Sequence, residues 1–268
     1  MLGGGFVGAA AMAAPPAEAR RSGARATFVL VHGAWHGGWC WRRVAERLEQ
    51  EGARVLAPTL TGLGERSHLL SANVSLETHI QDVVAVIEAE ELRDVHLVGH
   101  SYAGMVVTGV CDRLKDRMAS VTYLDAAVPA DGQSMTTQQP GLSPEAAAAT
   151  EAALRSLAPD GVAMAVPPDV SIFGVPAGSD DAAWLQRRLT PHPLRTWLEP
   201  IRLAQGGSQG LPRSYLHCVR PALTPSSFPA HHARLSRDPS WTVATLETGH
   251  DAMITAPDAV AERLMQPV

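Results

Sequence analysis

The sequence predicts an α/β fold in which a mostly parallel sheet of about six strands carries helices on both faces. Two observations predict it. Short runs of β-branched and aliphatic residues alternate along the chain with segments of helical periodicity, and these runs lack a polar face. A strand buried on both faces of a parallel sheet has that pattern. Parallel neighbours need crossover connections, which the intervening helices supply.

Six segments are expected to form the sheet. The first, residues 26–31, is a continuous β-branched and aromatic run followed at once by a Gly-rich turn. The others are residues 54–57, 95–98, 121–124, 214–219 and 243–246. Because active sites of such sheets lie at the carboxyl ends of the strands, we expect the chemistry in the loops that follow these segments.

Helical periodicity fills the spaces between the strands. One helix begins at Trp41 and ends before Gly52,. Ser75 can cap a second, because its hydroxyl can accept a hydrogen bond from a free N–H of the first turn. The inward face of that helix is Ile80, Val83, Val84 and Ile87. Further helices are expected over residues 102–115, 144–156 and 257–265.

The alternation stops between residues 129 and 213, where the chain is rich in Pro and Gly, has an Ala-rich helix and has no convincing strand. We interpret this region as a cap inserted into a core formed by residues 25–128 and 214–268. Residues 1–24 differ again, with an apolar Gly/Ala-rich run and an A-x-A sequence but no preceding Lys or Arg,. Both a leader and a signal segment fit, and with them a cytoplasmic or an exported protein.

The composition argues against several classes of function. The 268 residues are 46% hydrophobic, carry a formal net charge of −5 and have a sequence pI near 6.1. The chain is long enough for one substantial core, and it lacks the basic footprint of nucleic-acid binding. Its three cysteines form no C-x-x-C pair, and no stretch is apolar enough to span a membrane,. We therefore expect no redox motif, structural zinc or membrane span.

The segment from Val95 to Gly104 predicts a nucleophile elbow with Ser101 at its turn. It reads VHLVGHSYAG, a strand that runs into a sharp turn and then a helix. In the G-x-S-x-G pattern, small flanking residues let the backbone turn tightly, so that the serine hydroxyl projects from the sheet. Ala103 stands where the pattern has its second glycine, and Gly104 follows. A plain Gly-Ser turn between strand and helix is the alternative.

A Gly-rich loop directly after the first strand supports the elbow. It runs from His32 to Trp39 as HGAWHGGW. An oxyanion hole needs one backbone N–H from the residue after the nucleophile and one from such a loop, so the Tyr102 and Ala34 amides are the candidates. A metal bound by His32 and His36 would require a helix, and the glycines argue against one. We therefore expect no metal and no cofactor.

A histidine near the C-terminus is expected to act as the general base. His250 lies in a loop just after the last strand, in the sequence TGHDAM. Position distinguishes it from the other histidines. His217 lies inside a strand, and His231 and His232 fall in a surface helix. His100 adjoins the serine and should therefore point away from it.

The carboxylate that would orient His250 is not in its commonest place. The loop after the penultimate strand, residues 218–227, contains no Asp or Glu. Asp125 ends the strand beside that of the nucleophile, and it keeps the chain order Ser, Asp, His of this fold,. We predict Asp125 as the acid, with a capping role as the alternative. Asp131 and Asp251 are its rivals.

Together these residues resemble the α/β-hydrolase superfamily, and within it the branch of plant methylesterases, hydroxynitrile lyases and related bacterial esterases. The likeness is carried by residues 28–39, by residues 97–104 and by the Gly249-His250 loop. With the strand order it covers residues 26 to 266. It implies an α/β-hydrolase fold that starts directly at the first strand, without antiparallel N-terminal strands.

Two departures from that branch matter. Its plant members usually carry the catalytic aspartate after the penultimate strand, whereas Asp125 resembles the arrangement of haloalkane dehalogenases and some lipases. Hydroxynitrile lyases have a lysine right after the catalytic histidine, and Asp251 stands there, so lyase chemistry is disfavoured. A dehalogenase is disfavoured too, because its nucleophile would be an aspartate where this chain has Ser101.

The sequence therefore predicts a serine hydrolase of carboxylic esters of small, partly apolar substrates. Ser101 would attack the ester carbonyl to form an acyl-enzyme, while His250 takes its proton and Asp125 orients the imidazole. The residues expected to line an apolar substrate pocket are Trp35, Phe173, Trp184 and Trp197. The three in the cap could equally form its own core.

Other functions could use the same residues. A lyase, a lactonase or a natural-product tailoring enzyme could employ this triad, and some hydrolase-like folds act as ligand receptors. Tight ligand binding with negligible turnover would favour the receptor. The expected partner is a small-molecule ester, not a nucleic acid, and a homodimer is compatible with the sequence.

Overall fold

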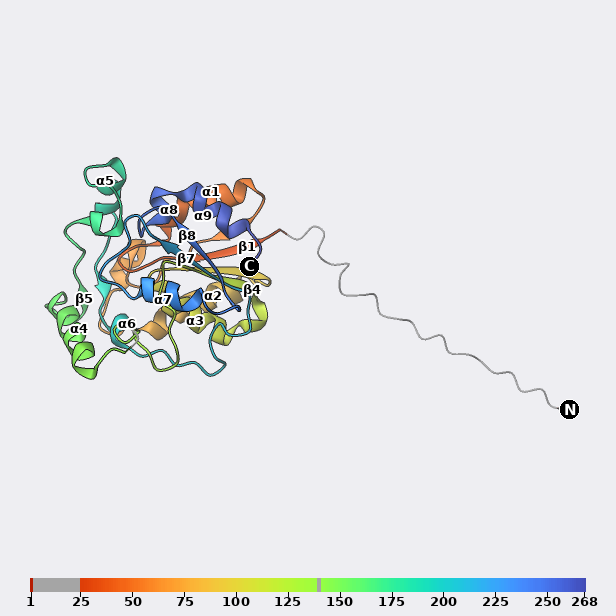
Figure 1. Ribbon diagram of the computed structural model, residues 1–268, viewed down its shortest axis with the longest axis horizontal. Helices are drawn as coiled ribbons and strands as arrows, with labels where there is room; N and C mark the ends of the chain where they lie inside the picture. Colours follow the sequence, from red (N-terminus) through yellow and green to blue (C-terminus); the bar gives the residue numbers. More distant parts are fainter. Residues whose placement is uncertain (2–24, 139–140) are drawn as a thin grey trace.

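Six parallel strands form the central sheet of the computed structural model, which describes residue 1, residues 25–138 and residues 141–268 (Figure 1). The strands are β1 (Thr27–Val31), β2 (Arg54–Leu56), β3 (Val95–His100), β4 (Met118–Leu124), β7 (Arg213–Cys218) and β8 (Thr242–Leu246). Their order is β2-β1-β3-β4-β7-β8, and all neighbours run parallel. The predicted fold class is confirmed, and each expected strand segment overlaps one of these strands.

Helices cover both faces of the sheet (Figure 1). They are α1 (Arg42–Gln50) and α9 (Pro257–Met265) on one face and α2 (Leu76–Ala89) and α3 (Ala103–Arg113) on the other. Side chains of β1 alternate between two cores: Val29 and Val31 pack with α2 and α3, whereas Phe28 and Leu30 pack with α1 and α9. This double burial is the reason that the strand has no polar face.

The strand that leads to Ser101 is longer than its sequence pattern indicates. The expected strand ends at Val98, but β3 continues to His100 and pairs on both sides, with Gly99 opposite Val31 and Tyr123. Glycine has a low intrinsic preference for strands, and a tertiary contact explains why one stands at position 99. A Cβ there would stand 2.7 Å from a methyl carbon of Val107, so glycine lets α3 approach the strand,.

The segment between β4 and β7 holds several short elements. These are α4 (Pro144–Ser156), β5 (Ala163–Met164), α5 (Asp180–Gln186), β6 (His192–Pro193) and α6 (Arg195–Leu198). The Ala-rich helix has the expected bounds. The expectation of no strand here is wrong, because β5 and β6 form an antiparallel pair. Each is only two residues long, which is too short for a periodic pattern to reveal,.

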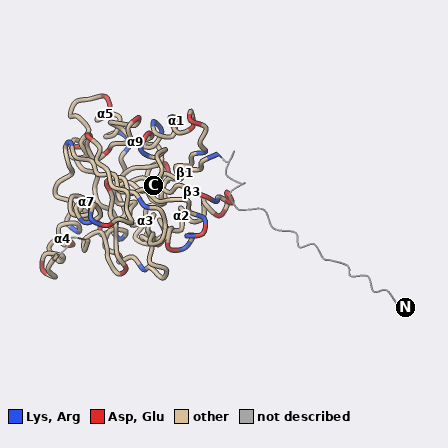
Figure 2. Tube along the Cα trace, turned by 45° about the vertical axis from the view of Figure 1, so that its right-hand side comes forward, with Lys and Arg blue, Asp and Glu red and all other residues tan. Residues whose placement is uncertain are grey.

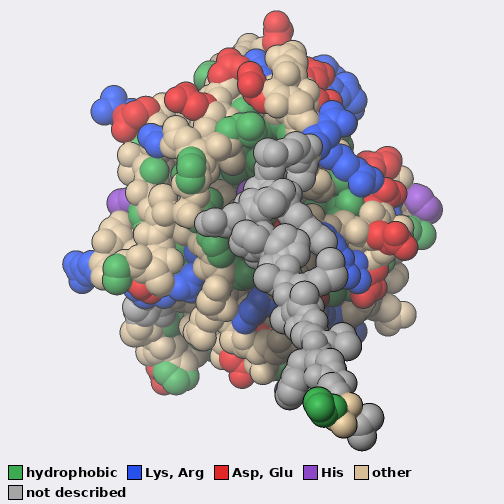
Figure 3. All heavy atoms as spheres, turned by 90° about the vertical axis from the view of Figure 1, so that its right-hand side faces the viewer, with side chains coloured by type: hydrophobic (Ala, Val, Ile, Leu, Met, Phe, Trp, Pro, Cys, Tyr) green, Lys and Arg blue, Asp and Glu red, His purple; other side chains and the backbone are tan. Residues whose placement is uncertain are grey.

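The remaining expectations concern the ends and the surface of the chain. The leader or signal segment lies, apart from Met1, outside the described residues. In the part that is described, no helix has both the length and the apolar character needed to cross a membrane. Basic and acidic side chains are intermingled along the chain in Figure 2 and on the face of the molecule shown in Figure 3.

Candidate active site

The carboxyl ends of four strands bring the predicted site residues to one edge of the sheet. Ser101 follows β3, Asp125 follows β4, and His250 lies in the loop after β8. The Gly-rich loop follows β1 and lies against the serine, since a Cβ on Gly33 would stand 2.9 Å from Ser101 Cβ. Residues far apart in sequence therefore meet where this class of sheet places its active sites.

Ser101 lies in a strained turn. Its φ of 56° is in the left-handed region, which few non-glycine residues adopt,. Three backbone hydrogen bonds hold it there: its N–H donates to the Leu124 carbonyl at 3.2 Å, and its carbonyl accepts from the amides of Gly104 at 3.1 Å and Ala127 at 3.0 Å. The turn is thus tied to the end of β4, and the serine is only half-buried.

Close packing explains why the residues of the elbow are small. A Cβ on Gly104 would stand 1.9 Å from the Ala127 carbonyl oxygen, so no side chain fits there. Ala103, in place of the second glycine of the pattern, fits and is fully buried. The departure from G-x-S-x-G is therefore accommodated, and Gly104 outside the pattern is a glycine that the turn requires.

His250 lies beside Asp125. Its Nδ1 donates a hydrogen bond to Asp125 Oδ2 at 2.6 Å, and both side chains are buried. The imidazole stacks on Phe228 with ring centroids 5.4 Å apart, and the His100 ring lies 4.5 Å away. A carboxylate only accepts, so Nδ1 carries the proton and Nε2 keeps its lone pair in the neutral ring. That tautomer suits a general base.

Asp125 has a second histidine partner that the sequence reasoning missed. His217 Nδ1 donates to Asp125 Oδ1 at 2.7 Å, and the Cys218 amide donates to the same oxygen at 3.2 Å. Burial by itself would raise the pKa of Asp125, but the hydrogen bonds from His217 and His250 lower it to about 2. The pairing of adjacent strands, with Leu124 opposite Leu216, is the signal that could have found His217.

The rival carboxylates have other partners. Asp131 accepts the Leu203 amide at 2.8 Å on the exposed surface. Asp251 is fully buried, and its Oδ2 lies 3.1 Å from His36 Nε2.

The expectation that His100 points away from the site is wrong, because its ring lies against that of His250 and its Nε2 donates to the His250 carbonyl at 3.0 Å.

The Gly-rich loop is held by histidines on both sides. His32 Nδ1 donates to the Gly33 carbonyl at 2.9 Å, and His36 Nδ1 donates to the Ala34 carbonyl at 2.7 Å. The Trp35 amide donates to Nδ1 of His192, which comes from β6, at 3.3 Å. Trp35 itself has a φ of 63°. These contacts fix the two peptide groups on either side of the Ala34 Cα, and none of them uses the Ala34 N–H.

The second predicted donor lies at the start of α3. Tyr102 is the N-cap residue of that helix, where backbone N–H groups have no partner within the helix,. Its side chain is buried, with the hydroxyl 3.0 Å from His79 Nδ1. Of the groups of Tyr102, the backbone N–H and not the hydroxyl therefore remains the candidate oxyanion donor.

One group of potential metal ligands is found in the described ranges. Ligand atoms of His100, His250 and Asp251 lie within 4.8 Å of one another. Each residue already takes part in a hydrogen bond: His100 with the His250 carbonyl, His250 with Asp125, and Asp251 with His36. We assign the three to a hydrogen-bond network. The three cysteines are buried free thiols.

Three of the four predicted pocket aromatics pack together. The Trp35 ring lies 6.0 Å from that of Phe173 and 5.7 Å from that of Trp197, centroid to centroid. Trp184 instead meets Trp39 edge-on at 5.0 Å. The aromatic group is thus Trp35 of the Gly-rich loop together with Phe173 and Trp197, which pack against it.

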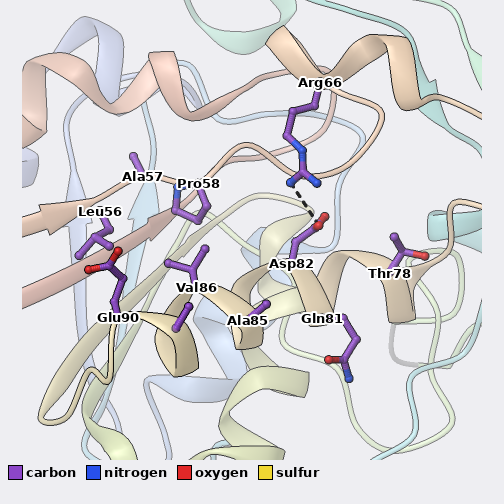
Figure 4. Close-up of a pocket in the computed structure, with 11 residues that line it drawn as sticks. Leu56, Ala57, Pro58, Arg66, Thr78, Gln81, Asp82, Ala85, Val86 and Glu90 are labelled. Atoms are coloured by element: carbon purple, nitrogen blue, oxygen red, sulfur yellow. Dashed lines mark hydrogen bonds and ion pairs between the residues drawn. The ribbon is translucent and has the colours of Figure 1, made fainter.

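A separate groove lies between β2 and α2 (Figure 4). Its volume is about 850 Å³, and none of the predicted site residues lines it. Of its two carboxylates, Asp82 accepts hydrogen bonds from the Thr61 amide and hydroxyl and from Arg66, and Glu90 accepts one from Arg54. The polar groups that meet at Asp82 therefore satisfy one another.

Comparisons with known proteins show the family to which the chain belongs. The alpha/beta hydrolase family matches residues 28–263. An extracellular alpha/beta-hydrolase of a Paenibacillus species, said to share structural and functional homology with tobacco salicylic acid binding protein 2, superimposes with a TM-score of 0.76 at 28% identity. The match covers 90% of this chain and 97% of that one. The chain belongs to the alpha/beta hydrolase family.

The curated relatives of the chain show which kind of alpha/beta hydrolase it is. The chain is 45% identical over 243 residues to the carbendazim hydrolyzing esterase of Nocardioides sp. (strain SG-4G), which covers 89% of this chain and 98% of the relative. It is 32% identical to a rice esterase (Oryza sativa subsp. japonica) over 53% of this chain and 50% of that one. The chain is an ester hydrolase of the methylesterase-like branch.

Proposed function

We propose that Ser101, His250 and Asp125 are the catalytic triad of this esterase and that it cleaves carboxylic esters of small, partly apolar substrates. The observation that carries the proposal is the buried hydrogen bond from His250 Nδ1 to Asp125, 2.6 Å long, at the sheet edge that displays Ser101. That bond sets the tautomer in which Nε2 can take a proton.

The proposed reaction has two halves. Ser101 Oγ attacks the carbonyl carbon while His250 Nε2 takes the hydroxyl proton, and the Ala34 and Tyr102 amides bind the oxyanion. Collapse of this intermediate expels the alcohol, which receives that proton from His250. Water then attacks the acyl-enzyme by the same route and releases the acid. Throughout, Asp125 stabilises the imidazolium.

Substrate selection falls to the segment between β4 and β7, which we propose acts as a cap. Phe173 and Trp197 pack against Trp35 of the Gly-rich loop, and the Phe173 ring also lies 6.3 Å from the His250 ring, centroid to centroid. Such a wall favours flat or apolar acyl or alcohol groups. Carbendazim, a methyl carbamate on an aromatic ring system, is a reasonable test substrate in view of the 45% identical relative.

The first experiment compares the wild-type protein with Ser101→Ala on a short-chain p-nitrophenyl ester and on carbendazim. We expect the variant to lose nearly all turnover, as much as about 10⁶-fold where a triad acts as a unit. A variant as active as the wild type would contradict the proposed nucleophile. Saturable ligand binding without turnover in the wild type would instead indicate a receptor.

A further inference from the structure

A second buried carboxylate lies one residue after the proposed base. Asp251 Oδ2 is 3.1 Å from His36 Nε2, and both side chains are buried. The other ring nitrogen, His36 Nδ1, is 2.7 Å from the Ala34 carbonyl oxygen. A carbonyl and an ionised carboxylate can only accept hydrogen bonds. Both nitrogens of His36 therefore carry a proton, and the ring is a cation.

The ionisation of both partners agrees with this geometry. Burial alone would lower the pKa of His36 and raise that of Asp251. The charge and hydrogen bond of each partner outweigh burial, so the pKa of His36 is raised and that of Asp251 is lowered,. The other titratable groups that interact with the pair are His32, His100, His192, His250, Cys40 and Cys218.

The histidines that surround this pair are neutral. His32 donates from one nitrogen to the Gly33 carbonyl and accepts from the Leu60 amide at 3.0 Å with the other, so it is neutral. His192 accepts the Trp35 amide with one nitrogen and is likewise neutral. Burial lowers the pKa of His32 to about 3 and that of His192 well below its usual value. The cation beside the Gly-rich loop is thus His36.

His36 acts on the loop through one peptide group. The Ala34 carbonyl and the Trp35 amide belong to the same peptide, which is held by His36 on one side and by His192 on the other. The preceding peptide is held by His32 through the Gly33 carbonyl. With both flanking peptide planes held, the direction of the Ala34 N–H is set.

We propose that Asp251 keeps His36 as a buried cation and that this cation fixes the Gly-rich loop so that the Ala34 N–H points at the oxyanion. The inference rests on the proposed function, because the oxyanion hole belongs to it. Asp251 and His36 are positioning residues. Asp251 also joins this loop to the base, since it pairs with His36 of the loop and follows His250 directly in the chain.

Asp251→Asn tests the pair with little change of shape. An uncharged amide no longer holds the cation, so His36 becomes neutral. Its hydrogen bond to the Ala34 carbonyl is then no longer charge-assisted and holds the loop less firmly. Loss of a whole oxyanion donor costs about 10²–10³ in kcat, so we expect a misaligned donor to cost about 10–100-fold. KM should change little. A kcat equal to that of the wild type would overturn the positioning role.

A spectroscopic readout follows the charge itself. In ¹⁵N long-range spectra of the labelled full-length protein at pH 8, we expect both His36 nitrogens of the wild type to be protonated. The signal is assigned by its loss in His36→Gln. In Asp251→Asn, one nitrogen should lose its proton at the same pH. A neutral His36 in the wild type would refute the proposal whatever the kinetics show.

A double-mutant cycle and a matched control complete the test. His36→Gln combined with Asp251→Asn should cost less than the sum of the two single changes, because each single variant leaves a partner unpaired. Additive losses would contradict the pair.

Asp112→Asn is the control, since this buried carboxylate accepts hydrogen bonds from three backbone amides of residues 204–207 away from the site. It should lower stability and leave kcat per folded molecule unchanged.

The outcomes separate this inference from the proposed function. If Ser101→Ala keeps full activity, the proposed triad fails, but the His36 spectra still report whether the cation exists. If Ser101→Ala is inactive while Asp251→Asn has normal kcat, the triad stands and the positioning role of Asp251 fails.

Discussion

Asp125 carries a negative charge at a place that water does not reach, and two histidines make that charge tolerable. An isolated buried carboxylate would take up a proton. Here Oδ1 accepts from His217 and Oδ2 from His250, and the pKa falls to about 2. The hydrogen bond from His217 thus helps to keep the Asp125 carboxylate ionised, and His250 can then act as the proposed base.

Asp125→Asn tests this residue most directly. Asparagine tolerates the φ of 43° at this position, but its NH₂ cannot accept the proton of His250 Nδ1, so the wrong tautomer is favoured,. We expect kcat to fall by roughly 10⁴ with the fold intact, measured on the p-nitrophenyl ester beside circular dichroism. Asp131→Asn is the matched control and should be near normal. Near-normal turnover in Asp125→Asn would refute the assignment.

At the scale of elements, the serine turn is made by the packing of β3, α3 and the end of β4. Ser101 is tied by hydrogen bonds to Leu124 and Ala127, so the strained turn is held by the neighbouring strand's end,. Gly99 admits α3 on one side, and Gly104 admits the Ala127 backbone on the other. The geometry of the serine turn therefore depends on glycines that have no proposed chemical role.

Gly104→Ala should disturb both stability and activity. The new Cβ would stand 1.9 Å from the Ala127 oxygen, and because that atom is backbone, α3 or the β4 loop must move. We expect a loss of about 1–3 kcal/mol in urea unfolding, together with a lower kcat. Ala103→Gly, which completes the G-x-S-x-G pattern, should retain most of the activity. A Gly104→Ala variant with normal stability would contradict this account.

At the scale of the whole molecule, the site is built on buried histidines. Burial lowers the pKa of His32 and His100 to about 3 and that of His79 to about 4. Each is neutral in the folded protein but takes a proton near pH 6.5 in the unfolded chain. The unfolded state therefore binds more protons below pH 6.5, and stability is lost as pH falls toward the folded-state values.

Urea unfolding between pH 8 and pH 4.5 tests this prediction. Above pH 7 these lowered-pKa histidines should contribute no change, because neither state protonates them there. The raised pKa of His36 acts in the opposite direction, so its contribution is full below pH 6.5 and is lost as the pH rises toward 8,. Below pH 6.5 the free energy of unfolding should fall by about 1.4 kcal/mol per pH unit for each such histidine. Asp125 acts in the same direction, since its lowered pKa makes its contribution disappear below about pH 4,. A stability that is flat down to pH 5 would contradict the neutral, buried state of these rings.

Much of the fold and part of the candidate site follow from local patterns. The strands and covering helices leave periodic signals of several residues, and the elbow and the Gly-rich loop are contiguous motifs,. Elements of two residues, such as β5 and β6, leave no such signal. Position alone predicted His250 and Asp125 as neighbours, and the structure places them in hydrogen-bond contact.

The sequence by itself determined the parallel sheet, the serine turn and the loop in which the candidate base lies, because each depends on residues close together in the chain. Tertiary structure decided which buried side chains share their protons. His217 and His250 reach Asp125 across 92 and 125 residues, and His36 reaches Asp251 across 215. Charge and tautomer depend on burial and on partners within about 3 Å, and only the folded chain brings those partners together.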